Sequence, residues 1–437
     1  MRRDQGPRRL TVLLAVAGLV AAPAAVLRGL CVGRSCDRPA PAQAYVPYCS
    51  LPDDTRKLIG AGFRDGRSPD VLGVTQGLDS VSTGERSWPS VQRAAADETV
   101  PLVFWGQGVA EGRRRAVTTL DSVAPTLAQI MRLDRPHPEV RSGTALEGVA
   151  AGGRPPRLVV LVVWKGVGFG ELRADPSAWR QLGRITGSGS WGRARVGSLP
   201  LDPTAVLTTI GTGGLPFQHG ITGRLVRNDD DKVVPAWSST APPSVIAALG
   251  DDLDELHGGR PLVGVVGTSP GDRGVIGRNW YLDPDADDAV VSPRPSREAL
   301  AELRKGYGAD KATDLLGVVD EGPLRRLELD LRRLVGAARR AAAGSVTFVL
   351  TATGHTASPG AISGRALAQR VASDVGIRGV IEDVAAGGFF LNDPVLSRKH
   401  VGEDTVVSAL RAQKSAAGDP LFADAFSAAS VTFGRYC

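Results

Sequence analysis

Apolar residues are most concentrated, after the N-terminal segment, in residues 158–164, a valine-rich run that follows two prolines and precedes a glycine-rich loop. The run is too short to span a membrane and too rich in β-branched residues to favour a helix. It therefore predicts a strand buried on both faces at the centre of a parallel sheet. Ligands of open α/β sheets bind at the carboxyl ends of such strands. Lys165 lies at this end, so its role is the first functional question.

Further short apolar runs alternate with segments of helical spacing along the chain. Strands are expected within residues 67–77 and at residues 100–105, 192–197, 262–267, 315–319 and 346–350. Helices are expected at residues 52–63, 121–131, 179–185, 204–212, 243–249 and 323–343. The helix at 204–212 has Asp202 as its cap and Pro203 at its first position. This alternation predicts an α/β fold with a mainly parallel central sheet flanked by helices on both faces.

The N-terminal segment combines four arginines among its first nine residues with an apolar run at residues 10–27. Ala22 and Ala24 within that run form a small-x-small cleavage site, so residues 1–30 are expected to be a secretory signal peptide. An uncleaved membrane anchor is the alternative, because the run is just long enough to cross a bilayer. Residues 31–48 are expected to be a linker, and the rest to lie outside the cytoplasm, secreted or anchored. Membrane contact is expected only through residues 10–27, and only if this segment stays uncleaved.

Composition and charge narrow the function classes. A chain of 437 residues with 42% hydrophobic content can bury a sizeable core. The net charge of +6 comes from arginine clusters that alternate with acids, and aromatic residues make up only 5%. Nucleic acid is therefore not expected as a partner.

Four cysteines lie beyond the apolar run, at Cys31, Cys36, Cys49 and Cys437. An even number in an exported chain predicts two disulfides rather than reactive thiols, and the spacing is not that of a zinc site. Three pairings are possible.

The segment after residue 204 contains Thr212-Gly213, Pro216 and His219-Gly220-Ile221. It resembles the T-G-x-x-P-x-x-H-G-I segment of the alkaline phosphatase superfamily, most closely its type I phosphodiesterase and nucleotide pyrophosphatase branch. Residues 101–108 and 121–126 resemble blocks found near the end of that family's catalytic domain. Residues 158–163 are similar to its first strand, and residues 346–353 to the strand before its late Asp-His pair.

The resemblance implies an alkaline-phosphatase-like sandwich spanning residues 49–437, but the order of the blocks is rotated. The simplest explanation is a circular permutation, with residues 49–150 as the usual C-terminal part and residues 157–437 as the N-terminal part. This implies that residues 71–74 and 100–105 join the sheet of residues 158–163. It also favours a Cys49–Cys437 disulfide across the old connection, which leaves Cys31 to pair with Cys36.

Family members hydrolyse phosphate esters with two metal ions, commonly zinc, that activate a threonine or serine nucleophile. Lys165 occupies the position of the family's first metal-binding aspartate, and an ammonium group cannot ligate a metal. Thr353-Gly354-His355 stands where the family has Asp-His-Gly, and the nucleophile position falls on Pro203, with Thr204 beside it. His257 ends an acidic segment that fits the solvated end of a helix better than a ligand pair. The sequence therefore predicts no metal site and no cofactor.

Two functions remain. The favoured one is a degenerate family member without the two-metal site, acting in binding or cell-surface assembly. In it Lys165 pairs with a nearby acid or binds a phosphate-bearing or other anionic ligand. The alternative is a phosphoester or phosphodiester hydrolase with a rebuilt site. There Thr204 would be the nucleophile at a helix N-terminus, with Lys165 and His355 as base or oxyanion support. Zinc or another divalent metal belongs only to this alternative.

Overall fold

The computed structural model describes residues 47–77, 81–83, 86–92, 99–185, 187–278, 280–281, 288–354, 362–434 and 437. The expected signal peptide or anchor, the Cys31–Cys36 pairing and His355 lie outside the described residues, and so does nearly all of the expected linker. Among the residues that are described, no helix combines the length and apolar character needed to cross a membrane.

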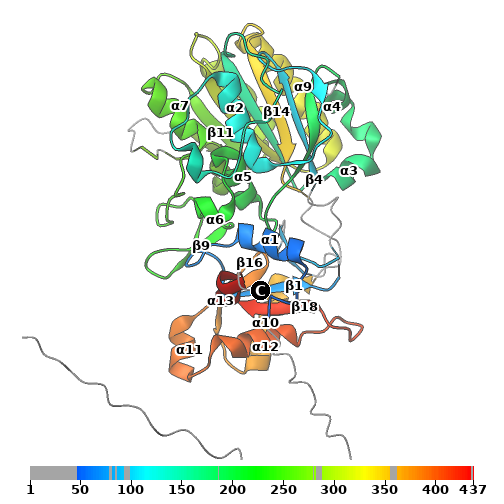
Figure 1. The fold of residues 1–437 in the computed structure, drawn as a ribbon, viewed down its shortest axis with the longest axis vertical. Helices are drawn as coiled ribbons and strands as arrows, with labels where there is room; N and C mark the ends of the chain where they lie inside the picture. The colour runs from blue at the N-terminus through cyan, green and yellow to red at the C-terminus, as the bar shows by residue number, and fades with distance from the viewer. Residues whose placement is uncertain are drawn as a thin grey trace, which may run out of the picture. The chain divides into compact units, whose positions relative to one another are not determined.

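Strand β7 (Leu158–Lys165) is the central strand, as predicted, and all eight of its residues are buried. Its neighbours are β13 (Asp314–Glu321) and β14 (Val346–Ala352), and both run parallel to it. Because β7 has no polar face, it is stable only where both faces of the sheet are covered. Figure 1 shows this strand layer covered by helices.

The sheet around β7 has nine strands in the order β12-β11-β13-β7-β14-β4-β8-β5, with β6 also paired to β8. The other strands are β4 (Thr99–Gly106), β5 (Gly112–Arg113), β6 (Thr118–Thr119), β8 (Gly189–Arg195), β11 (Val263–Gly267) and β12 (Asp288–Val291). Strand β4 runs antiparallel to both of its neighbours, and every other pairing in this sheet is parallel. The predicted fold class, α/β with a mainly parallel central sheet, is confirmed.

Helices cover both faces of this sheet (Figure 1). Those of the large sheet are α2 (Val123–Met131), α3 (Phe169–Ala174), α4 (Arg180–Ile185), α5 (Pro203–Thr212), α6 (Pro216–His219), α7 (Leu249–His257), α8 (Pro295–Glu302) and α9 (Leu324–Ala341). On one face α8 and α9 pack together over β7, β11 and β13, with α4 beside α9. On the other face α2 and α7 pack against α5.

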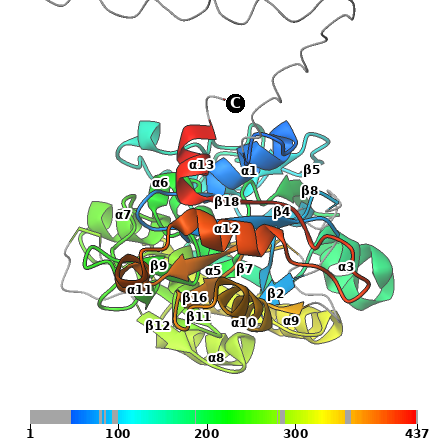
Figure 2. The same ribbon diagram turned by 90° about the horizontal axis from the view of Figure 1, so that it is seen from below.

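A second, four-stranded antiparallel sheet has the order β16-β17-β1-β18. Its strands are β1 (Val71–Thr75), β16 (Ile381–Ala385), β17 (Gly388–Leu391) and β18 (Phe422–Ser427). Helices α10 (Gly364–Val375) and α12 (Glu403–Arg411) pack against it, as Figure 2 shows. The remaining elements are α1 (Asp53–Gly62), α11 (Asp393–Lys399), α13 (Ala428–Phe433) and the short strands β2 (Val81–Thr83), β3 (Arg86–Ser87), β9 (Leu225–Arg227), β10 (Val233–Pro235) and β15 (Ile362–Ser363). Trp88, Phe389 and Phe422 anchor a separate apolar core here.

The second sheet corrects one expectation. Residues 100–105 do join the central sheet, as β4, but residues 71–74 do not, so that part of the prediction is wrong. Strand β1 pairs instead with β17 and β18. Those partners come from a part of the chain for which the sequence pattern predicted no strands. The permutation called for both segments in one sheet with residues 158–163, and this condition is not met.

A second correction concerns the helix expected at residues 243–249. Helix α7 begins at Leu249 and runs to His257. Pro242 and Pro243 favour extended backbone in front of it. Asp251 and Asp252 lie in its first turn, where carboxylates interact favourably with the helix dipole.

Cys49 and Cys437 form a disulfide, as the resemblance implied. The bond joins residues 388 positions apart in the sequence. Tyr48, beside Cys49, packs edge-on against Phe426 of β18, so this end of the chain is also held by side-chain contact. Disulfides persist mainly in oxidising compartments, which supports an extracytoplasmic location.

Candidate functional site

Three charged side chains meet at the carboxyl edge of the central sheet. Lys165 is the last residue of β7, and Glu321, the last residue of β13, is its direct neighbour in the parallel register. Asp272 lies in the short 3-10 helix η4 (Pro270–Val275), which follows β11. Parallel strands end at the same edge, so the fold itself brings these three residues together.

The Lys165 ammonium lies between the two carboxylates. Its Nζ is 3.3 and 3.4 Å from the two oxygens of Asp272 and 3.3 Å from Oε2 of Glu321. The side chains of Lys165 and Asp272 are 5% and 2% exposed, whereas that of Glu321 is 38% exposed. Lys165 therefore pairs with nearby acids, which was one of its two expected roles. Its charge is already compensated, so it is not a free site for an anion.

The Asp272 carboxylate is held by its own loop as well. It accepts hydrogen bonds from the backbone N–H groups of Thr268 and Ser269, at 2.7 and 3.0 Å, and from the Ser269 hydroxyl at 2.9 Å. A carboxylate that accepts this many hydrogen bonds is fixed in position. The ammonium of Lys165 is thus paired with a carboxylate whose orientation is fixed by its own loop.

Helix η4 is placed by unusually close contact with α5. A Cβ atom on Gly211 of α5 would lie 2.3 Å from the carbonyl oxygen of Gly274. A Cβ atom on Gly274 would in turn lie 2.4 Å from Oγ1 of Thr208. Only glycine allows the two backbones to approach this closely. The contact presses η4 onto α5 and so positions Asp272.

Thr204 lies in the first turn of α5, also against η4. A Cβ atom on Gly271 would be 2.9 Å from its Oγ1. Its backbone N–H donates to Oδ1 of Asp202 at 2.9 Å, which confirms Asp202 as the predicted helix cap. Lys165 and Thr204 thus both lie next to η4, but no hydrogen bond joins them. Of the three predicted site residues, these two lie in one neighbourhood and His355 is outside the described residues.

The residues at this edge do not fit a pair of divalent metal ions. The ammonium of Lys165 would repel a cation placed beside it. The two carboxylates beside it are already bound to that ammonium. In the part of the chain that the structure describes, no three or more histidine, cysteine, aspartate or glutamate side chains are grouped as metal ligands.

The buried histidine His219 has a structural role. His219 is fully buried; its Nδ1 accepts from the backbone N–H of Ile221 at 3.2 Å, and its Nε2 lies 3.1 Å from Oγ1 of Thr209. Burial, with a smaller effect of nearby Arg64, lowers the pKa of His219 to about 3. It therefore holds the turn after α6 as a neutral ring. His257 is exposed at the last position of α7, in line with the expected helix end.

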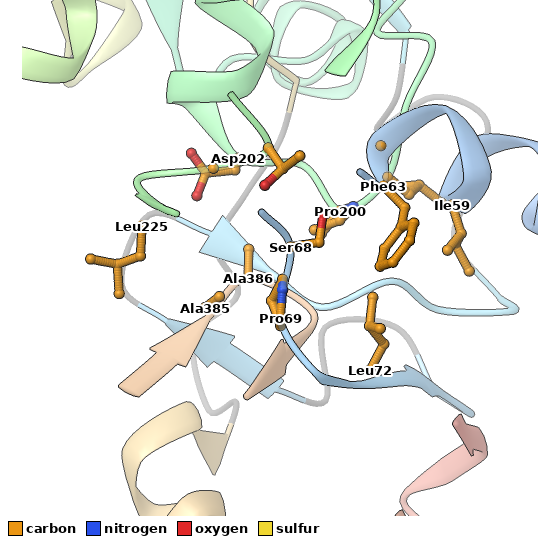
Figure 3. Close-up of a pocket in the computed structure, with 14 residues that line it drawn as sticks. Ile59, Phe63, Ser68, Pro69, Leu72, Pro200, Asp202, Leu225, Ala385 and Ala386 are labelled. Atoms are coloured by element: carbon orange, nitrogen blue, oxygen red, sulfur yellow. The ribbon is translucent and has the colours of Figure 1, made fainter. Parts of the chain in front are cut away.

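One small cavity lies close to Asp202 (Figure 3). Its walls include Phe63, Leu72 and Pro200, and its volume is about 10 Å³. That is room for one water molecule at most. The cavity is therefore a packing defect beside the helix cap and has no capacity for a ligand.

Larger grooves flank helix α9, and one of about 1000 Å³ starts at Glu321. Arginines line it, among them Arg297 and Arg333. The sequence reasoning missed these residues, and also Asp272 and Glu321. Two signals were present: both acids follow predicted strands at the ligand-binding edge, and arginine pairs recur along the predicted helix at 323–343.

No protein-family model and no curated protein matches this sequence. Among solved structures the chain is similar to wild-type alkaline phosphatase PafA, with 14% identity and a TM-score of 0.43 over 60% of this chain and 76% of that one. A mutant form of PafA gives a TM-score of 0.42. Phosphonoacetate hydrolase from Sinorhizobium meliloti 1021 is similar at 15% identity and a TM-score of 0.29, over 48% of this chain and 58% of that one. At these values the likeness supports no argument about activity.

Proposed function

We propose that this protein is an exported, alkaline-phosphatase-like protein that works without the two-metal site and acts in binding or assembly at the cell surface. One observation carries the proposal. The ammonium of Lys165 lies between Asp272 and Glu321, at the edge where the family's motifs would put metal ions. A lysine in that place supplies the positive charge permanently, so the fold needs no cation there.

Export is the second part of the proposal. The N-terminal arginines and the apolar run at residues 10–27 favour it, and the Cys49–Cys437 disulfide supports it because such bonds persist outside the cytoplasm.

Metal titration tests the first part directly. The full chain, treated with a chelator and dialysed, is titrated with zinc or manganese chloride in a calorimeter, alongside Lys165→Asp. The wild type is expected to show no saturable binding. Lys165→Asp should gain a binding event, because a third carboxylate would then lie beside Asp272 and Glu321. Saturable binding of two equivalents by the wild type would overturn the proposal.

The alternative hydrolase depends on Thr204. In its favour, Thr204 is buried at the N-terminus of α5, next to the loop that holds Asp272. Against it, the carboxylate of Asp202 accepts the hydrogen bond from the N–H of Thr204. Its negative charge offsets the positive end of the helix dipole, which would otherwise stabilise a nucleophilic oxygen there. Turnover of an aryl phosphodiester by the wild type, lost in Thr204→Ala and kept in Thr432→Ala, would establish the hydrolase and end the binding proposal.

A further inference from the structure

Helix α9 repeats a pair of adjacent arginines every seven residues. The three pairs are Arg325-Arg326, Arg332-Arg333 and Arg339-Arg340. Seven residues are about two helical turns, or about 10.5 Å, so the pairs fall on one side of the helix over about 21 Å. The buried residues of α9, such as Leu327, Leu331 and Leu334, lie on the opposite side.

Grooves run along both flanks of this side of α9. The groove of about 1000 Å³ separates it from the start of α8, and a second of about 700 Å³ separates it from the end of α8 and the turn that follows. A third, of about 410 Å³, lies between α9 and α4. We call the three grooves and the arginine pairs of α9 the arginine face.

The arginine face carries a concentrated positive charge. The residues that line the three grooves include ten arginines, no lysine and three carboxylates, which gives a net charge of +7. The entire chain carries +6, and residues 1–46 carry seven arginines and two aspartates, so the rest of the chain outside the grooves has a net negative charge. A surplus gathered in one place creates a local field that attracts anions.

Much of this charge is available. Arg297, Arg332 and Arg340 are exposed and form no ion pair with any residue that the structure describes. Arg325 is 76% exposed, and its only described partner is Asp175 at 3.4 Å. An exposed guanidinium keeps its donors for a bidentate contact with phosphate or carboxylate oxygens.

The shape and composition of the arginine face select among anionic partners. A bilayer-binding helix would expose several large apolar residues beside its basic ones, but here Leu329 stands alone, at 36% exposure. A surface that binds single-stranded nucleic acid usually has aromatic side chains on which the bases stack, and no aromatic residue lines these grooves. A regular spacing of charges along grooves suits a chain with regularly spaced anions.

We infer that the arginine face binds a linear polymer that carries phosphate groups at regular intervals, lying along the grooves beside α9. The largest groove reaches Glu321, which pairs with Lys165, but the arginines that support this inference lie on α8, α9 and α4, and the inference does not depend on the function proposed for Lys165. Metal binding at Lys165 and polymer binding at α9 are therefore tested by different measurements.

The test measures binding of long-chain inorganic polyphosphate to the full chain at several salt concentrations. The variant Arg297→Gln/Arg332→Gln removes one unpaired arginine from each flank of α9. Its control, Arg398→Gln/Lys399→Gln, removes the same charge from exposed positions of α11. For a single-stranded polyanion each ionic contact contributes a salt slope of about 0.7, or about fivefold in affinity at 0.1 M salt.

The Arg297→Gln/Arg332→Gln variant should therefore bind about 25-fold more weakly at 0.1 M salt, with a slope smaller by about 1.4, while the control stays within about twofold of the wild type. An equal loss of affinity in both variants would overturn the proposal, because binding would then depend only on the total charge of the protein. Equally tight binding of polyglutamate would overturn the phosphate assignment. Tighter, α9-dependent binding to phosphatidylglycerol vesicles would replace the polymer with a membrane.

Discussion

Replacing Lys165 with methionine removes the buried ammonium and keeps most of the side-chain volume. Asp272, whose side chain is 2% exposed, is then left charged without its partner. At 3.3 Å and an effective dielectric constant of about 20, the attraction between the two unit charges is about 5 kcal/mol. Breaking a buried pair from one side costs about 3–5 kcal/mol in measured cases. The free energy of unfolding of Lys165→Met should therefore fall by about that amount.

A double-mutant cycle isolates the pair. The variants are Lys165→Met, Asp272→Asn and the two combined, each unfolded with urea and followed by tryptophan fluorescence. The combined variant has no unpaired buried charge, so its loss should be smaller than the sum of the single losses by about 2–3 kcal/mol.

Lys305 provides the matched control. Its Nζ also lies between two carboxylates, 2.8 Å from Glu302 and 3.3 Å from Asp288, but its side chain is 52% exposed. Water and salt screen such a pair, so Lys305→Met should change stability far less than Lys165→Met. The reasoning is refuted if the two lysine variants lose equal stability, or if the losses in the Lys165 and Asp272 cycle simply add.

Three further predictions concern stability. Burial lowers the pKa of His219 to about 3, so the folded state binds a proton at this ring more weakly than the unfolded chain does. Between pH 7 and pH 4 the free energy of unfolding of the wild type should therefore fall by about 3 kcal/mol more than that of His219→Gln. An equal fall in the two proteins, measured by urea unfolding at both pH values, would contradict this. Asp202→Ala removes the cap of α5 and the acceptor for Arg224 N–H, and should cost about 2 kcal/mol in the same assay, with no loss disproving the cap's contribution. Cys49→Ser should cost about 2–5 kcal/mol, and a reducing agent should bring the wild type to the same midpoint; a reductant-insensitive wild type would show that the bond does not stabilise the fold.

Local pattern was enough to predict the central elements. The valine run predicted the bounds of β7 to within one residue, and Asp202 with Pro203 predicted the start of α5. Both predictions were possible because burial on both faces and helix capping leave signals in the local sequence. The second sheet left no such signal. Residues 71–75 are apolar enough for either sheet, and their partners in β17 and β18 are more than 300 residues away.

The site was predictable only in part for a related reason. Lys165 stood out because it ends the most apolar strand, and the need for a nearby acid followed from burying its charge. Which acid it would meet depended on the strand order, which puts β13 directly beside β7 and brings the loop after β11 to the same edge. Asp272 also depends on the glycine contacts between η4 and α5, and nothing in the local sequence reveals them.

The Cys49–Cys437 bond has a mechanical consequence. A pull applied between the chain ahead of Cys49 and the backbone at Cys437 passes through a single covalent link, because the bond joins these two points directly. The two sheets and their helices lie between these two residues in the sequence and therefore bear none of the applied force. If the segment before Cys49 is tethered, tension along the chain would leave both cores unstretched until the disulfide is reduced. After reduction the force would act on the whole segment between the two cysteines, which are 388 positions apart in the sequence.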